Sequence, residues 1–126
     1  MLPKQRFYLR WLKSLPRRIQ EDFRRDAERQ MWWGRGVSIA ASAVINTNEQ
    51  SVLEIGYGSL IGAFTVLDLL SDPVVQTPMP SVLRIGQRTA INEFNNIRAA
   101  GSQIEIGNAC LISQYVAIIG SNHATQ

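Results

Sequence analysis

The chain has 126 residues, of which 45% are hydrophobic and 18% charged, so its composition predicts one folded domain and not a disordered tail. One cysteine (Cys110) and one histidine (His123) exclude an internal disulfide framework and a metal site built from several such residues of one chain. No apolar run approaches the roughly 18 residues of a membrane span, and the basic start lacks the apolar region of a signal peptide. We therefore expect a cytoplasmic protein.

The first 36 residues carry the positive charge of the chain. They hold ten Lys or Arg and four acids, a balance of +6, whereas the other 90 residues hold three Arg and six acids, a balance of −3. An electrostatic partner is therefore expected at residues 1–36. Nucleic acid is not expected there, because no recognition motif accompanies the charge.

Residues 1–36 are predicted to form a basic amphipathic helical segment. Pro16 suits the first turn of a helix, Gly34 suits its end, and apolar residues recur every four positions between them, at Ile19, Phe23, Ala27 and Met31. The preferred interpretation is a helix that packs this stripe on the core and leaves its basic face in solvent. The alternative is attachment to an anionic membrane surface, which would make the protein peripheral at the inner face of the membrane.

From residue 37 onward the sequence has a step of six residues. Aliphatic residues separated by six positions form three triplets, which are Ile55, Ile61 and Leu67; Ile85, Ile91 and Ile97; and Ile106, Ile112 and Ile118. Neither a helix nor a plain alternating strand repeats every six residues, whereas a short strand followed by a tight turn does. Three such steps make one triangular coil of about 18 residues, and stacked coils bury a continuous apolar column. Residues 37–126 are thus predicted to be a mainly β domain, a parallel β-helix.

Small residues and insertions fit the same coil. Four positions after the aliphatic residue the side chain is mostly small and is expected to point inward, at Ser59, Thr65, Thr89, Asn95, Cys110 and Val116. Within a triplet the spacing stays at six residues. Extra residues occur only between one triplet and the next, where a corner loop can bulge outward. The largest excess, residues 68–80, contains three prolines and is predicted to be a loop outside the sheets. Trp32 and Trp33 are expected to cover the first coil.

The repeats of residues 37–123 resemble those of the hexapeptide-repeat acyltransferases, whose coils form a left-handed parallel β-helix. The nearest branch is that of the maltose, galactoside and capsular-polysaccharide O-acetyltransferases. Its motif runs Ile-Gly, Ile and Ile at six-residue intervals and then His, which corresponds here to Ile106-Gly107, Ile112, Ile118 and His123. The branch also has an Asn after the second aliphatic position of the preceding coil, and Asn92 matches it.

The resemblance implies transfer of an acetyl group from acetyl-CoA to a hydroxyl of a sugar or surface polysaccharide, without a metal. His123 is expected to act as general base, since a neutral imidazole can take a proton near physiological pH, and Asn92 is expected to hold the acceptor hydroxyl. Asn122, Tyr115 and Phe94 are the candidate substrate-binding residues. Cys110 is expected to be core filler, not a nucleophile.

The resemblance also concerns assembly and length. Relatives are homotrimers with active sites between subunits, and they continue for several coils past the histidine, where they contact CoA. We therefore expect a homotrimer and a chain that is a C-terminally truncated fragment, and we assign no residue to CoA binding. Two other classes remain open: a β-helical zinc hydratase of the carbonic anhydrase kind, which would need three histidines, and a non-catalytic scaffold or membrane-attached structural protein.

Overall fold

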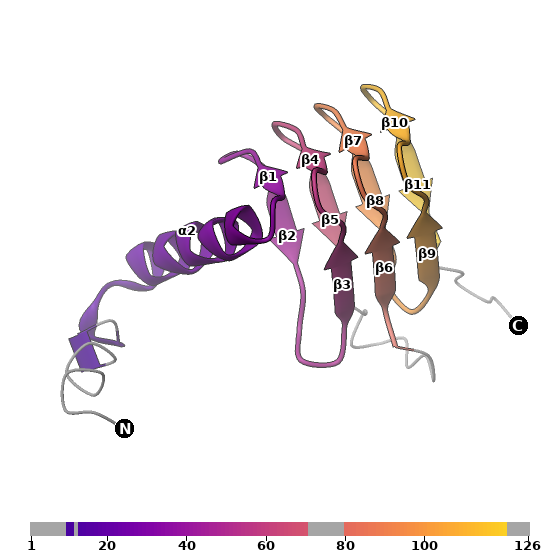
Figure 1. The fold of residues 1–126 in the computed structure, drawn as a ribbon. Coiled ribbons are helices and arrows are strands. Elements are labelled where there is room, and N and C mark those ends of the chain that lie inside the picture. The colour runs from indigo at the N-terminus through magenta and orange to yellow at the C-terminus, as the bar shows by residue number, and fades with distance from the viewer. Residues whose placement is uncertain (1–9, 12, 71–79, 121–126) are drawn as a thin grey trace, which may run out of the picture.

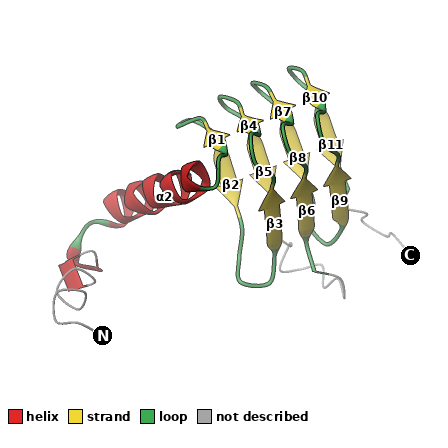
Figure 2. Ribbon diagram, in the orientation of Figure 1, coloured by secondary structure: helices red, strands yellow, loops and turns green. Residues whose placement is uncertain are grey.

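A computed structural model describes residues 10, 11, 13–70 and 80–120 of the chain. One helix leads into a stack of parallel strands, which Figure 1 and Figure 2 show side by side along a single direction. The helix leaves the first coil on the side away from the other coils (Figure 1). The predicted order, a helical segment followed by β coils, is therefore the order that the structure has.

Helix α2 (Arg17–Gly34) begins and ends close to the predicted residues. Pro16 caps its start, and the side chain of Gln20 donates a hydrogen bond to the carbonyl of Leu15 at 2.7 Å. At the other end Gly36 has a φ of 79°, and a Cβ there would stand 2.3 Å from the ring of Tyr57. Only glycine fits this turn, which directs the chain from the helix into the first coil.

Eleven strands in the described residues build the coils. They are β1 (Ser38–Ile39), β2 (Val44–Asn46), β3 (Val52–Ile55), β4 (Leu60–Ile61), β5 (Val66–Asp68), β6 (Val82–Ile85), β7 (Ala90–Ile91), β8 (Asn96–Arg98), β9 (Gln103–Ile106), β10 (Leu111–Ile112) and β11 (Ala117–Ile119). They form three parallel sheets: sheet A (β1-β4-β7-β10), sheet B (β2-β5-β8-β11) and sheet C (β3-β6-β9). Successive strands along the chain visit sheets A, B and C in turn, which is the course of a parallel β-helix.

The register of the sheets confirms the six-residue step. In sheet A, Ile39, Ile61, Ile91 and Ile112 pair in succession. In sheet B the same is true of Ile45, Leu67, Ile97 and Ile118, and in sheet C of Ile55, Ile85 and Ile106. These columns form the core, in which Ile61, Leu67, Ile91 and Ile97 are fully buried. Each predicted triplet therefore contributes one member to every sheet.

Extra residues enter the coils at one corner only. The aliphatic residues are six positions apart from sheet A to sheet B and from sheet C to sheet A. From sheet B to sheet C they are 10 apart at Ile45 and Ile55, 18 apart at Leu67 and Ile85, and 9 apart at Ile97 and Ile106. Residues 71–79 of the predicted loop lie outside the described part of the chain, but Leu69 at its start is fully buried. The other two corners thus keep a tight, uniform turn.

Inward polar side chains link each coil to the next. At the corner between sheets C and A, the hydroxyl of Ser59 donates to the carbonyl of Gly86 at 2.7 Å and accepts from the N–H of Thr89 at 3.1 Å. The hydroxyl of Thr89 repeats the pattern with the carbonyl of Gly107 and the N–H of Cys110. These residues must be small to fit inside the turn and polar because the turn leaves backbone groups without sheet partners.

The sequence predicts that helix α2 packs on the core along its apolar stripe, but only its last turn packs on the first coil. Trp32 is 4% exposed and belongs to the core cluster, but Trp33 is 68% exposed. Residues 17–27 are all exposed except Gln20, which is half-buried. The prediction that the apolar stripe packs on the core is therefore wrong for these residues, and of the two tryptophans only Trp32 covers the coil.

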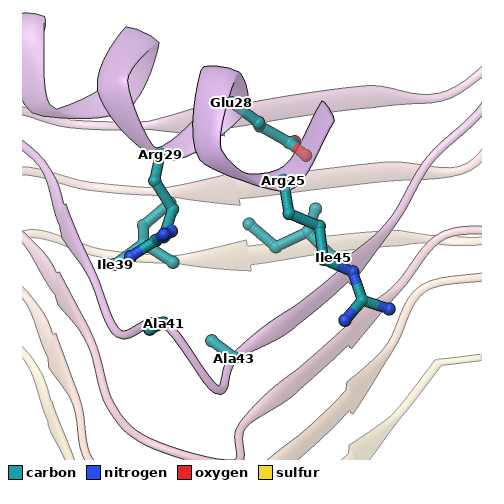
Figure 3. A pocket seen from close by; sticks show the side chains of 7 residues that line it. All are labelled: Arg25, Glu28, Arg29, Ile39, Ala41, Ala43 and Ile45. Atoms are coloured by element: carbon teal, nitrogen blue, oxygen red, sulfur yellow. The ribbon is translucent and has the colours of Figure 1, made fainter. Parts of the chain in front are cut away.

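Charged residues, not the stripe, line the contact between α2 and the coil. Figure 3 shows Arg25, Glu28 and Arg29 on the side of the helix that faces Ile39 and Ile45. The pocket that they line together with residues of the first coil measures about 20 Å³, which is room for about one water molecule. Burial raises the pKa of the Glu28 carboxyl above its usual range, and an interaction with the indole of Trp32 partly opposes this shift.

No described helix combines the length and the apolar character that crossing a bilayer requires.

Candidate active site

The turns between sheets A and B bring several of the predicted site residues together. Three of these turns comprise residues 62–65, 92–95 and 113–116, and we call the surface that they form the aromatic corner. Because Ile91 pairs with Ile112, the turn after Ile91 stacks directly on the turn after Ile112. Asn92 and Phe94 therefore lie one coil above Ser113 and Tyr115.

Asn92 begins its turn directly after strand β7. Its N–H donates to the carbonyl of Ile112 at 2.9 Å, and its carbonyl accepts from the hydroxyl of Thr65 at 2.7 Å and the amide of Asn95 at 3.1 Å. The backbone of Asn92 thus holds three coils together, while its side chain is half-buried at the surface of the corner. Left-handed backbone does not explain an Asn at this position, because the residue with positive φ in this turn is Phe94.

Phe64, Phe94 and Tyr115 form a ladder of stacked rings along the corner. The ring centroids of Phe64 and Phe94 are 5.2 Å apart and those of Phe94 and Tyr115 5.3 Å, with interplanar angles of 12° and 7°. All three residues have a φ between 57° and 59°, a conformation that costs a bulky residue about 1–2 kcal/mol. Offset stacking of about 0.5–1.5 kcal/mol for each pair compensates part of this cost.

Stacking limits which parts of these rings a ligand can contact. The ring faces that point toward each other within the ladder are covered by stacking, so the ladder presents its ring edges and the hydroxyl of Tyr115 to solvent. Tyr115 is accordingly 76% exposed. Among the described rings, the outer faces of Phe64 and Tyr115, at the two ends of the ladder, are stacked on no other ring. A sugar at this corner would therefore contact the ring edges, the tyrosine hydroxyl or one of these outer faces.

Sequence reasoning missed three members of the corner. Phe64 follows Ile61 by three positions, the same spacing that separates Phe94 from Ile91 and Tyr115 from Ile112, so the repeat could have identified it. Glu93 and Gln114 lie next to the predicted residues, and the amide of Gln114 donates to the carboxylate of Glu93 at 2.6 Å. Their contact is across coils and follows only from the stacking register.

His123 and Asn122 lie outside the described residues, so the structure says nothing of their distance from Asn92 or Tyr115. Cys110 is at the inward position of its turn, as predicted, with its N–H bonded to the hydroxyl of Thr89 at 3.2 Å. In the part of the chain that is described, no three residues among His, Cys, Asp and Glu are grouped so that they could hold a metal ion.

Outside the corner, a row of charged side chains lies on sheet C. Arg84 of β6 contacts Glu54 of β3 at 3.1 Å and Glu105 of β9 at 3.5 Å. One arginine between two carboxylates on successive coils forms a cross-strand ion-pair row, which is typical of a solvated sheet face. We assign it no part in the site.

Comparisons with protein-family models, with curated proteins and with solved structures found no match in any of the three.

Proposed function

We propose that the chain is a hexapeptide-repeat O-acetyltransferase that acetylates a hydroxyl of a sugar or surface polysaccharide. Acetyl-CoA supplies the acetyl group as an activated thioester. In this proposal the coils have the left hand of the family that the repeats resemble, and three copies assemble with active sites between them. The protein then acts in the cytoplasm in polysaccharide biosynthesis.

The chemistry is assigned to His123 and Asn92. The neutral imidazole of His123 takes the proton of the acceptor hydroxyl as its oxygen attacks the thioester carbonyl, and the proton leaves with the CoA sulfur as the thiol. The side-chain amide of Asn92 holds the acceptor hydroxyl in line. Tyr115, Phe94 and Asn122 contact the sugar. No covalent intermediate on the protein is needed, which agrees with an inward structural place for Cys110.

The observation that carries the proposal is the register of the coils around the motif. Ile106, Ile112 and Ile118 each occupy the inward column of a different sheet, so the six-residue step of the motif is a structural repeat as far as Ile118. The same register places Asn92 beside the turn that holds Tyr115. The geometry therefore supports the part of the motif that lies within the described residues.

The test is an acetyl-transfer assay with the chain as its gene encodes it. Acetyl-CoA is incubated with methyl glucoside, methyl galactoside and capsular oligosaccharides, and free thiol and acetylated product are measured. His123→Ala should lower kcat/KM by at least about 100-fold with an unchanged melting temperature. The rate of the unsubstituted chain should rise with pH through about 6.5, as the imidazole loses its proton.

The role of Asn92 in acetyl transfer is tested against a second asparagine that lies outside the corner. Asn92→Ala should lower kcat/KM by about 10-fold or more, since the loss of one positioning hydrogen bond costs 1–2 kcal/mol. Asn96→Ala, on the exposed side of β8, should have no effect. Full activity in His123→Ala contradicts the proposal. Absence of any transfer supports the scaffold, and bound zinc at one atom per site would support the hydratase.

A further inference from the structure

Helix α2 carries an apolar stripe that the coils of the chain do not cover. Ile19, Phe23, Ala27 and Met31 follow one another at intervals of four, which places them on one side of the helix. Ile19 is 42% exposed, Phe23 39% and Met31 43%, and Ala27 is exposed as well. Trp11 adds an edge-to-face ring contact to Phe23, with centroids 5.8 Å apart.

The stripe faces away from the coils of its own chain. The side of α2 that faces the first coil holds Arg25, Glu28, Arg29 and Trp32 (Figure 3). Successive residues are about 100° apart around a helix, so the centre of the stripe lies nearly opposite this side. The coil therefore cannot cover the stripe without a half-turn of the helix.

Opposite charges flank the stripe on its two sides. The same helical projection places Asp22 and Asp26 along one side and Arg17 and Arg24 along the other. Asp26 and Arg17 already pair within the helix, with Arg29 and Glu21 respectively.

Asp22 and Arg24 make no ion pair within the described part of the chain. One unpaired acid and one unpaired base thus stand on opposite sides of the apolar surface.

This charge pattern fits a second copy of the helix better than a membrane. An anionic bilayer surface favours basic residues along both sides of an apolar stripe, and here one side is acidic. Two copies that run parallel and face each other place the acidic side of one opposite the basic side of the other. An antiparallel symmetric pair would oppose acid to acid. The charges therefore select the parallel arrangement.

The stripe also has the shape for such a contact. Ile19, Phe23, Ala27 and Met31 form a ridge of i, i+4 residues, and ridges of this kind interlock at a crossing angle near −50°. The small Ala27 lies between two large residues, where the backbones can approach most closely. Because α2 leaves the coils on the side away from β10 (Figure 1), parallel helices leave the coils of both copies at the same end of the assembly.

We propose that the stripe of α2 pairs in parallel with the same stripe of a second copy, with Ala27 at the crossing point and Arg24 facing Asp22 of the other copy. The pairing does not depend on the acetyltransferase assignment.

Cysteine crosslinking tests the pairing of the helices directly and does not depend on how the coils of different copies associate. In a Cys110→Ser background, Ala27→Cys should form an intermolecular disulfide under mild oxidation in dilute solution, because a disulfide needs Cα atoms about 4.4–6.8 Å apart. Arg18→Cys, on another side of the same helix, is the control and should give about 10-fold less crosslinked product. Equal yields at the two positions overturn the proposal.

Charge reversal then separates the second copy from the membrane. Arg24→Asp and Asp22→Arg should each lower the yield of the Ala27→Cys disulfide about 10-fold through like-charge opposition, and the double reversal should restore it. Arg18→Asp should change nothing. On vesicles of phosphatidylglycerol and phosphatidylcholine, Asp22→Arg would instead strengthen binding. Stronger vesicle binding together with an unchanged disulfide yield overturns the pairing in favour of the membrane.

Discussion

The side-chain oxygen of Asn95 accepts a hydrogen bond from the backbone N–H of Val116, one coil further along the chain, at 2.8 Å. The side-chain nitrogen of Asn95 donates at the same time to the carbonyl of Ser113. One buried amide, 1% exposed, therefore satisfies two backbone groups of a turn that has no sheet partner for them.

Removing this amide should destabilise the stack of coils. Asn95→Ala leaves the two backbone groups without their protein partner, at an expected cost of about 2 kcal/mol in the free energy of unfolding. Asn96→Ala makes the same change at the neighbouring exposed position of β8 and should cost less than about 0.5 kcal/mol. Urea unfolding of both variants measures the difference, and equal losses would show that the inward amide does not link the coils.

Two equivalent glycines should differ in their tolerance of a methyl group. A Cβ on Gly86 would stand 2.6 Å from the backbone carbon of Gly107 in the next coil, whereas a Cβ on Gly107 would meet, among the described residues, only the sulfur of Cys110, at 3.7 Å. Gly86→Ala should therefore lower the free energy of unfolding by about 2 kcal/mol or more through overpacking. Gly107→Ala should be neutral or slightly stabilising. A comparable loss in both variants, measured by thermal unfolding, would contradict the stacking seen here.

The aromatic ladder should be most sensitive at its middle ring. Phe94→Ala removes two stacked pairs and Phe64→Ala removes one, and each pair is worth about 0.5–1.5 kcal/mol beyond its buried area. Denaturant unfolding should show a loss about twice as large for Phe94→Ala. A smaller loss for Phe94→Ala than for Phe64→Ala would rule out a cooperative ladder.

If the stack also positions a sugar, Tyr115→Phe should raise the acceptor KM without lowering the melting temperature.

Glu28 should make the stability of the contact between α2 and the coil depend on pH. Its carboxyl has a pKa raised by burial, so the folded state binds a proton more tightly than the unfolded state does. The cost of burying the charge is present above the raised pKa and disappears as the pH falls through it towards 4.5, the usual value for the unfolded chain. Glu28→Gln, which keeps the size of the side chain without its charge, should therefore raise the melting temperature at pH 7.

The advantage of Glu28→Gln should shrink as the pH is lowered to 4. Glu21→Gln, an exposed acid of the same helix that pairs with Arg17, is the control and should show no such trend. A melting temperature that falls in Glu28→Gln at pH 7 would refute a burial penalty.

The repeat in the sequence was sufficient to predict the coils because each step of six residues is a local unit. Ile91 and Ile112 are each followed by turn and small residues in the same order, and the structure pairs these two isoleucines in one column. Phe94 and Tyr115 occupy the same position of successive repeats, three residues after Ile91 and Ile112. Their stacking does not follow from this periodicity, because ring contacts depend on which coil follows which and on the insertions between them.

The sequence by itself determined the fold class, the inward residues and the ends of α2, since hydrophobic periodicity and turn residues act over a few neighbours. Only the tertiary structure decided which side of α2 meets the coil. The stripe of Ile19 and Phe23 has the pattern of a core-facing surface, and that pattern cannot distinguish the core of its own chain from another apolar partner. The turn at Gly36 sets the direction in which the helix leaves the first coil, and it leaves the stripe facing outward.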